Sequence, residues 1–311
     1  MKHGIGLTSL LVAVAGVILV GYWIQANYVP RAEGKQPSGP FRIPGYRQMA
    51  ENALREFSNL PTAEQSALRR NLDKNIVSVA SWLDRVGESG VQVLCLGENH
   101  ADATRQFLAR TLFSELDVDA LLLEVTPHRL EQITQELGWG KERVPLLGAD
   151  IADVIRTVRK RNPDIELIGI EETQAQRISR QAIDRRSPRD ESIENNFWQS
   201  FRYGSRQVIL LGALHCTNRE QWFYGGIRRL APSRVANEML NVRVVAEHQD
   251  GPVEAFVYFL RKIGIPRNDF VIVGSQALPP LVREWFDLLN LVLEDFDVLI
   301  VFRSRLQESD G

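Results

Sequence analysis

"VQVLCLGENH", residues 91–100, combines a run of strand-forming residues with three polar side chains that follow a glycine. The run 91–96 is largely apolar, which is typical of a strand covered on both faces. Gly97 lets the chain turn sharply off the sheet. Glu98, Asn99 and His100 then lie at the carboxyl end of the strand. The segment therefore predicts a buried strand that leads into a polar site.

Short apolar runs alternate with amphipathic segments from residue 91 onward. The runs expected to form strands are 91–96, 120–125, 144–147, 166–170, 207–211, 242–246, 270–273 and 297–302. The segments expected to form helices between them include 103–116, 151–160, 189–201, 253–263 and 281–293. Such alternation implies right-handed crossovers between parallel strands. The predicted fold class is α/β, a three-layer α/β/α arrangement with a mainly parallel central sheet.

Three regions are expected along the chain. Residues 46–311 form a single α/β domain, with a helical extension over 46–88 and a core over 89–303. The extension is expected to contain two helices, over 46–58 and 62–86, packed outside the core. Residues 27–45 hold four prolines and three glycines, which indicates an irregular linker.

The amino terminus has the pattern of a membrane anchor. Residues 4–24 carry no charge and have about the length of a membrane span, with Tyr22 and Trp23 at the far end. The following residues fit a cleavage site poorly, so we expect an uncleaved transmembrane helix over 1–26. This predicts a single-pass membrane protein, attached to the membrane by the N-terminal helix, with the globular domain on the extracytoplasmic side.

The charge and cysteine content exclude some classes of function. A net charge of −2 gives no global sign of a nucleic-acid partner, and we expect none. Cys95 and Cys216 are too few for a disulfide framework. Both lie in or beside apolar runs, which favours two buried free thiols. The chain also lacks a phosphate-binding Gly-x-x-x-x-Gly-Lys loop and a Gly-x-Ser-x-Gly nucleophile elbow.

Polar residues follow most of the predicted strands. Ligands of open parallel sheets bind beyond the carboxyl ends of the strands, so these residues are candidates for a site. His100 and His215 each stand three residues after a glycine that ends a strand, and Glu124 ends the strand at 120–125. The other polar residues in such positions are Asp150, Glu171, Glu172, Glu247, His248 and Arg303.

Two histidines and a carboxylate at one sheet edge are typical ligands of a divalent transition metal. We therefore predict His100, His215 and Glu124 as metal ligands. A bound metal would lower the pKa of a water molecule, and Glu98 or Glu124 could take its proton. Two alternatives remain open for the histidines, since His100 could cap the next helix and His215 could be structural. The carboxylates could instead form salt bridges, Glu98 or Glu124 with Arg105 or Arg129.

A basic cluster, RRSPRD at residues 185–190, precedes the helix predicted at 189–201. Ser187-Pro188 is a typical helix start, and the acidic residues behind it suit the helix dipole. Arg189 is expected to bind an anionic substrate group or to stabilise an oxyanion, because its helix should pack beside the strand that leads to His215. The alternative is a solvated run of charges.

Together the two Gly-x-x-His motifs, Glu124, the Arg189-Asp190 pair and the LLGALH strand at 210–215 resemble the Tiki/TraB superfamily. This superfamily includes ChaN-like haem-binding proteins and erythromycin-esterase-like proteins. Gly97-Glu98-x-His100 is similar to the ChaN-like variant of the motif. The resemblance extends clearly from about residue 91 to residue 215.

The resemblance implies a membrane-anchored hydrolase that cleaves a peptide, ester or amide bond with metal-activated or glutamate-activated water. Its cofactor would be a divalent manganese, cobalt, zinc or iron ion, and its substrate a peptide or a small molecule. In this set Glu98, Glu124 and Arg189 are the catalytic residues. An alternative implied by the same resemblance is a non-catalytic protein that binds haem or iron. A third reading is a scaffold whose site is only structural.

Overall fold

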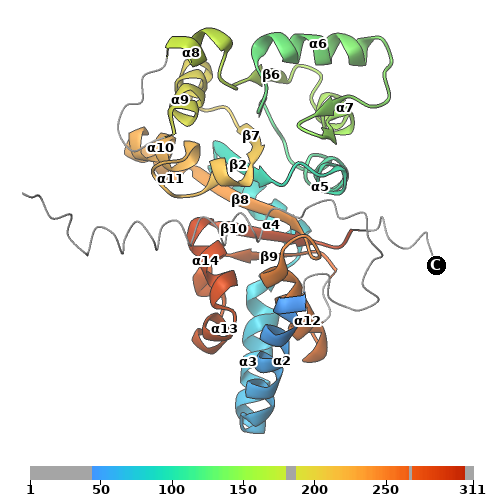
Figure 1. Ribbon diagram of the computed structural model, residues 1–311, viewed down its shortest axis with the longest axis vertical. Helices are drawn as coiled ribbons and strands as arrows, with labels where there is room; N and C mark the ends of the chain where they lie inside the picture. Colours follow the sequence, from blue (N-terminus) through green and yellow to red (C-terminus); the bar gives the residue numbers. More distant parts are fainter. Residues whose placement is uncertain (1–43, 180–186, 266–267, 305–311) are drawn as a thin grey trace, which may run out of the picture.

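The computed structural model describes residues 44–179, 187–265 and 268–304, which form a mixed α/β fold around an eight-stranded sheet (Figure 1). The strand order is β1-β9-β10-β8-β2-β7-β3-β6. The strands are β1 (Ile76–Val77), β2 (Val93–Glu98), β3 (Ala120–Leu123), β6 (Glu166–Gly169), β7 (Gln207–Gly212), β8 (Met239–Ala246), β9 (Phe270–Val273) and β10 (Val298–Phe302). The strands from β10 to β6 run parallel, and β9 is antiparallel to both neighbours. The predicted α/β class with a mainly parallel sheet is confirmed.

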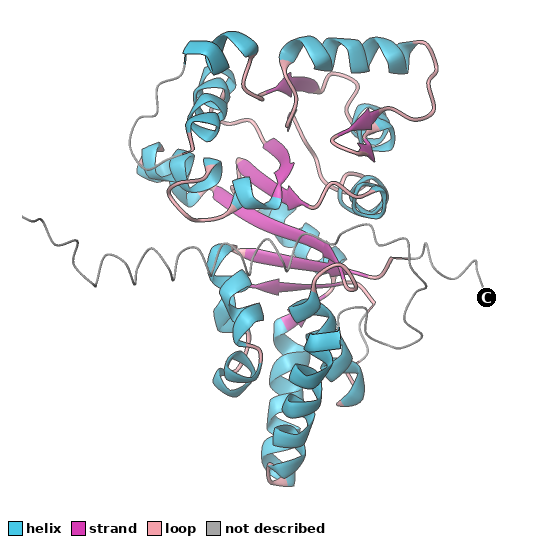
Figure 2. Cartoon of the chain, viewed as in Figure 1, coloured by secondary structure: helices cyan, strands magenta, loops and turns pink. Residues whose placement is uncertain are grey.

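Helices lie on both sides of this sheet (Figure 2). Successive side chains of a strand point to opposite faces, so Leu94 and Leu96 of β2 join one core cluster while Val93 and Cys95 join another. The first face is covered by α4 (Val79–Glu88), α5 (Asp102–Phe107), η1 (Leu108–Leu112), α6 (Pro127–Gly138) and α7 (Ala152–Arg161). On the second face, α9 (Pro188–Ser200) and α10 (Phe223–Leu230) cover β2, β3 and β7.

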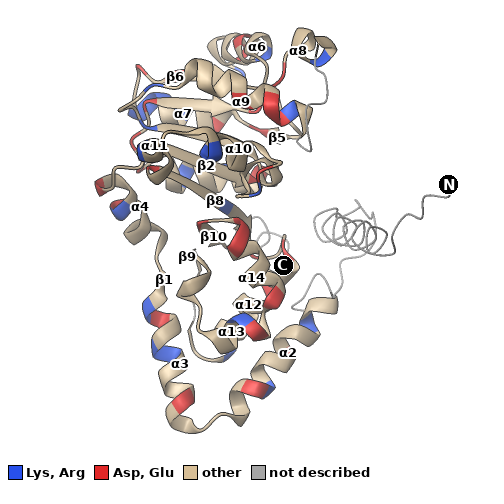
Figure 3. Ribbon diagram, turned by 90° about the vertical axis from the view of Figure 1, so that its left-hand side faces the viewer, with Lys and Arg blue, Asp and Glu red and all other residues tan. Residues whose placement is uncertain are grey.

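Four helices cover the rest of the second face, one from the beginning of the described residues and three from residues 251–295. Helices α2 (Pro44–Asn59), α12 (Gly251–Lys262), α13 (Pro280–Trp285) and α14 (Asp287–Asp295) pack over β8, β9 and β10. Helix α2 lies directly on α12. The ring of Tyr46 in α2 fills the space that a Cβ on Gly251 of α12 would need. Together with α3 (Thr62–Asn75), α2 extends away from the sheet and carries charges of both signs (Figure 3). The short remaining elements are α8 (Gln174–Ser179), α11 (Ser233–Asn237), η2 (Ala213–Cys216) and η3 (Ser275–Ala277).

Three predicted elements differ from the structure. The helix predicted over 281–293 is divided into α13 and α14 at Phe286, whose backbone is not helical. The helix predicted over 62–86 is divided, because Ile76 and Val77 pair with β9 as an edge strand and Ser78 then caps α4 by accepting the N–H of Ser81. The strand predicted at 144–147 is not part of the sheet. It forms a separate hairpin of β4 (Pro145–Leu146) and β5 (Ala149–Asp150), because Leu147 and Gly148 adopt positive φ angles of 51° and 88° and reverse the chain.

The predictions concerning a membrane are corrected. No helix within residues 44–179, 187–265 and 268–304 is long and apolar enough to cross a membrane. A span needs about 20 apolar residues, whereas α2, the longest helix of these ranges, has 16 residues and several charged side chains. The predictions of a transmembrane signal anchor, of a single-pass membrane protein and of the membrane as a partner are therefore not upheld. The segment 1–26, on which they rested, lies outside the described residues.

Candidate functional site

The carboxyl ends of three neighbouring strands meet at the candidate site. In the sheet β7 lies between β2 and β3, and all three run parallel. Strand β2 ends at Glu98 and leads to His100, β3 leads to Glu124, and β7 leads into η2, which carries His215. The start of α9 adds Arg189. The five residues predicted from the sequence are therefore brought together, while the roles predicted for them remain predictions.

Glu98 is buried and its position is fixed by Arg105. Its Oε1 accepts hydrogen bonds from Arg105 Nε at 2.9 Å and Nη2 at 2.8 Å, and lies 3.1 Å from His100 Nδ1. Arg105 is also buried, and its Nη1 donates to the carbonyl oxygens of Leu146 and Ala149 in the hairpin. The pairing of Glu98 with Arg105, one of the alternatives left open by the sequence, is thus present, but it is buried and contacts the site.

His100 turns its ring over the strand ends. Its backbone has a φ of +52°, a left-handed conformation that residues other than glycine rarely adopt. Its Nε2 lies 3.5 Å from Glu124 Oε2, while Nδ1 faces Glu98. The His100 side chain is 26% exposed, against 1% for Glu98 and 6% for Glu124. His100 is therefore the most exposed of these three side chains, and its Nε2 faces Glu124.

Gly97 has a different role from the predicted one. It lies inside β2, so the chain does not turn there but at His100. A Cβ at position 97 would come within 2.9 Å of Ala213 Cα and 3.2 Å of Cys216 Cβ. The absence of a side chain at this position therefore allows η2, with His215, to pack directly against β2.

Glu124 is held between both histidines and a backbone amide. Its Oε2 accepts the N–H of Gly212 at 2.7 Å, and its Oε1 accepts Arg189 Nη2 at 2.6 Å. Burial favours the neutral acid, but the nearby His215 and His100, the Gly212 amide and Arg189 together hold the pKa of Glu124 below its ordinary value. The side chain is therefore a carboxylate near neutral pH.

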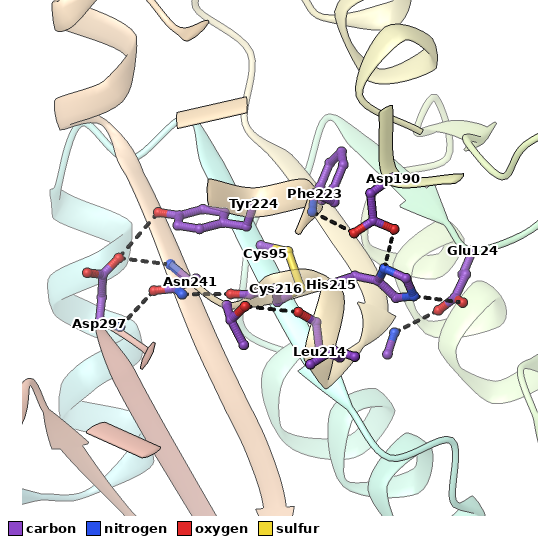
Figure 4. The surroundings of a disulfide bond; sticks show 12 residues. Cys95, Glu124, Asp190, Leu214, His215, Cys216, Phe223, Tyr224, Asn241 and Asp297 are labelled. Carbon is purple, nitrogen blue, oxygen red and sulfur yellow. Dashed lines mark hydrogen bonds and ion pairs between the residues drawn. A yellow bond between two sulfur atoms is a disulfide. The ribbon is translucent and has the colours of Figure 1, made fainter. Parts of the chain in front are cut away.

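His215 is held from both ring nitrogens. Its Nδ1 lies 2.8 Å from the buried carboxylate of Asp190, which also accepts the N–H of Phe223 at 2.8 Å (Figure 4). Its Nε2 lies 2.8 Å from Arg189 Nη1 and 3.7 Å from Glu124 Oε1. Burial lowers the pKa of His215, but Asp190 and Glu124 outweigh this effect, so the pKa is raised above its ordinary value.

Arg189 connects these groups through its guanidinium. Nε donates to Glu171 Oε1 at 2.9 Å and Nη2 to Glu171 Oε2 at 2.5 Å. These bonds, with those to Glu124, raise the pKa of Arg189 despite its partial burial. Neither Glu171 nor Asp190 was assigned a role from the sequence, although the sequence contains a signal for each. Glu171 directly follows a predicted strand, and Asp190 directly follows Arg189. Of the predicted basic cluster, residues 185–186 lie outside the described residues.

The prediction of two free thiols is wrong. Cys95 of β2 and Cys216 of η2 form a disulfide, with a Cα–Cα distance of 5.7 Å, and both residues are fully buried (Figure 4). They are 121 residues apart in the sequence. The bond becomes possible because Gly97 allows η2 to approach β2, and this approach cannot be seen in the spacing of two cysteines.

The arrangement of these residues differs from that expected of a metal site. No group of three His, Cys, Asp or Glu side chains in the described ranges is arranged to hold a metal ion. The guanidinium of Arg189 contacts both Glu124 and His215, and a cation bound to these two residues would be repelled by it. In the observed arrangement the predicted ligands therefore do not fit a metal, and no reaction step is assigned to one. The metal and haem predictions stay predictions.

Comparisons with known proteins give no family for this chain. No family model matches it, and no curated protein matches it. A structural match is found with the C-terminal region of Pasteurella multocida toxin, described as having a thiol-protease-like catalytic triad. The TM-score is 0.37 and the identity 8%, over 66% of this chain and 30% of the toxin chain. The chain thus spans less than a third of that relative's length. A likeness at this level carries no argument about function, and the resemblance to the Tiki/TraB superfamily stays a prediction.

Proposed function

We propose that this chain is a hydrolase that cleaves a peptide, ester or amide bond with water activated by His100. The observation that carries the proposal is the placement of two histidines on either side of Glu124. Each ring has its Nδ1 beside a buried carboxylate, Glu98 for His100 and Asp190 for His215. Each Nε2 lies within 3.7 Å of a Glu124 oxygen.

The contact between His100 and Glu124 suits a water molecule. When Nδ1–H of His100 donates to Glu98, Nε2 carries a lone pair. The ionised Glu124 is likewise an acceptor, so the two atoms cannot bond directly to each other. A water molecule has two O–H donors and can donate one to each. This arrangement would orient the water with its oxygen lone pairs available for attack.

In the proposed reaction the water oxygen forms a bond to the carbonyl carbon while His100 Nε2 takes a proton from the water. The negative charge of Glu98 stabilises the resulting imidazolium, and Arg105 keeps that carboxylate in place. Catalysis by such a base is worth about 10²–10⁴-fold in rate. Glu98 itself is too deeply buried to reach the water, so its proposed role is to orient and stabilise His100.

The oxyanion is assigned to the other side of Glu124, and the leaving group to His100. Nη1 of Arg189 has a second N–H beyond the one that faces His215, and this N–H is suited to an oxyanion. As the scissile bond breaks, the imidazolium of His100 gives this proton to the departing oxygen or nitrogen, which restores the neutral base. His215 holds the guanidinium in place, since its Nε2 accepts from Arg189 Nη1 and its Nδ1 faces Asp190.

The test uses chromogenic esters and fluorogenic peptides with the purified chain, in the presence and absence of EDTA. We expect hydrolysis that EDTA leaves unchanged and that His100→Ala reduces by about 100-fold or more. His128→Ala is the matched control, because His128 lies on α6 with a single hydrogen bond to Gln132. Full activity in His100→Ala would contradict the proposal.

A metal-dependent form of the same hydrolase was predicted from the sequence, but the contacts of Arg189 with Glu124 and His215 oppose it. Metal analysis of the purified chain separates the two forms. About one manganese, cobalt, zinc or iron ion per chain, lost in the double variant His100→Ala, His215→Ala, would support the metal form. A haem absorbance band that shifts on titration of the chain and depends on the same histidines would instead support the non-catalytic alternative.

A further inference from the structure

The disulfide joins the two sides of the candidate site. Cys95 precedes Glu98 by three residues on β2, and Cys216 directly follows His215. Strand β2 leads to the Glu98–His100 pair. The 3-10 helix η2 supplies His215, whose partner Asp190 lies on α9 (Figure 4). The bond therefore fixes the segment that carries one histidine to the strand that leads to the other.

A hydrogen bond from β8, the neighbour of β2 in the sheet, is the second contact that holds η2. The buried Asn241 of β8 donates from Nδ2 to the carbonyl oxygen of Cys216 at 2.6 Å and to that of Asp295 at 2.9 Å (Figure 4). Its Oδ1 accepts the N–H of Asp297 at 2.7 Å. Cys216 is thus held by a covalent bond on the β2 side and by a hydrogen bond on the β8 side.

These anchors matter because η2 has little stability of its own. It is a single four-residue 3-10 helix, and such short turns have poor hydrogen-bond geometry. The ring of His215 must nevertheless stay 2.8 Å from both Asp190 and Arg189. A displacement of about 1 Å in a catalytic group can cost about 100-fold in rate. The position of the ring therefore depends on what holds Cys216.

We propose that the Cys95–Cys216 disulfide is a positioning element of the site, and that the chain is fully active only when this bond is formed. The inference rests on the hydrolase function proposed above, which it extends with a redox requirement. Reduction by a phosphine would break the S–S bond and form two thiols. The two electrons come from phosphorus, and water supplies both protons and the oxygen of the phosphine oxide. Freed from the covalent bond to β2, Cys216 would keep its hydrogen bond from Asn241.

A disulfide with only a structural role would change stability and leave the site unaltered. The two possibilities are separated by comparing the wild type with Cys95→Ala, Cys216→Ala. The matched control is Leu289→Ala, which removes a buried side chain of α14 in the core cluster on the other half of the sheet. All three proteins are measured at a temperature at which each is folded, and thiol counting first establishes that the native wild type has no free thiol.

In the double cysteine variant we expect kcat to fall about tenfold or more, while KM changes less than about threefold. We also expect loss of the low-field NMR signal of the His215 Nδ1 proton that Asp190 holds. The control should lose stability but keep both kcat and the proton signal. If the cysteine variant does not fold, the wild type reduced with a phosphine replaces it.

Wild-type kcat and an unchanged proton signal without the disulfide would overturn the inference, as would free thiols in the native chain. The proton signal is recorded without substrate, so it also tests the positioning role in a chain that proves inactive. In that case the proposed hydrolase function fails, while loss of the signal on breaking the disulfide still supports the positioning of His215.

Discussion

Asp190 tests the proposed role of His215 at the level of a single residue. The substitution Asp190→Asn keeps an oxygen for the Phe223 amide, but it places an NH₂ group or a neutral oxygen beside His215 Nδ1. The carboxylate that orients the imidazole, and through it the guanidinium of Arg189, is then absent. We expect kcat to fall by about 10²–10³-fold and the free energy of unfolding to fall by about 1–3 kcal/mol.

The matched control for this change is Asp153→Asn, since Asp153 is an exposed residue of α7 whose partner is the exposed Arg156. It should leave kcat unchanged and shift stability by less than about 0.5 kcal/mol. Steady-state kinetics and chemical denaturation measure both quantities. Equal losses of kcat in the two variants would argue against a specific role for Asp190.

Gly97 gives a second prediction at this scale. In Gly97→Ala the new methyl group would lie 2.9 Å from the backbone of Ala213, so η2 must shift away from β2. We expect a loss of about 1–3 kcal/mol in stability, together with lower activity because His215 moves. Gly90→Ala is the control, because nothing lies within 4 Å of its added Cβ. Equal stability of the two variants in denaturation experiments would show that the close approach is absent.

Only part of the candidate site could be predicted from the residues of the sequence. His100, Glu124 and His215 were found because each follows an apolar run, and the parallel strands then bring the three together. The function of Gly97 and the disulfide could not be found in this way. Both depend on the packing of η2 against β2, between residues more than a hundred positions apart in the chain.

At the scale of the elements, two helical glycines should respond in opposite directions to alanine. Gly225 in α10 allows close packing, since an added Cβ would lie 2.3 Å from the carbonyl oxygen of Arg219. Gly225→Ala should therefore destabilise the chain by about 3 kcal/mol. Gly87 in α4 has open space around its Cβ position. Gly87→Ala should stabilise the chain by about 0.5–1 kcal/mol, because alanine favours the helix. Thermal denaturation checks both signs, and a stabilising Gly225→Ala would contradict the packing.

The helix predicted over 62–86 shows that helical spacing of apolar residues is not sufficient to predict one continuous helix. Leu68, Leu72, Ile76, Val79 and Leu83 have helical spacing, and all five are buried. The structure nevertheless places Ile76 in a strand, because the free edge of β9 offers backbone hydrogen bonds that a local pattern cannot indicate. Conversely, the hairpin at 145–150 has strand-like residues but no edge of the main sheet beside it.

At the scale of the whole molecule, the alternation of strands and helices was sufficient to predict a mainly parallel sheet with helices on both faces. The order of the strands was not predicted. The strand order depends on which connections return the chain to the centre of the sheet. Contacts such as the hydrogen bond between Asn241 and Asp297 join neighbouring strands only after folding. The charges of the site were individually visible in the sequence, but their mutual distances depend on that order.

Those charges predict how the stability of the whole chain depends on pH. The pKa of Glu124 is lowered by folding, since its histidine, amide and arginine contacts outweigh burial. The stabilisation that this provides is present above the ordinary pKa of 4.5 and is lost as the pH falls through the lower value in the folded state. The pKa of His215 is raised by Asp190 and Glu124 against the effect of burial. Its stabilisation is present below the ordinary pKa of 6.5 and is lost as the pH rises through the higher folded value.

We therefore expect both contributions to be present between about pH 4.5 and 6.5. Denaturation of the wild type and of His215→Gln over a pH series should show a difference in unfolding free energy that shrinks above this window. The difference between the wild type and Glu124→Gln should instead shrink below it. A difference for His215→Gln that stays constant through the neutral range would mean that folding does not raise the pKa of this histidine.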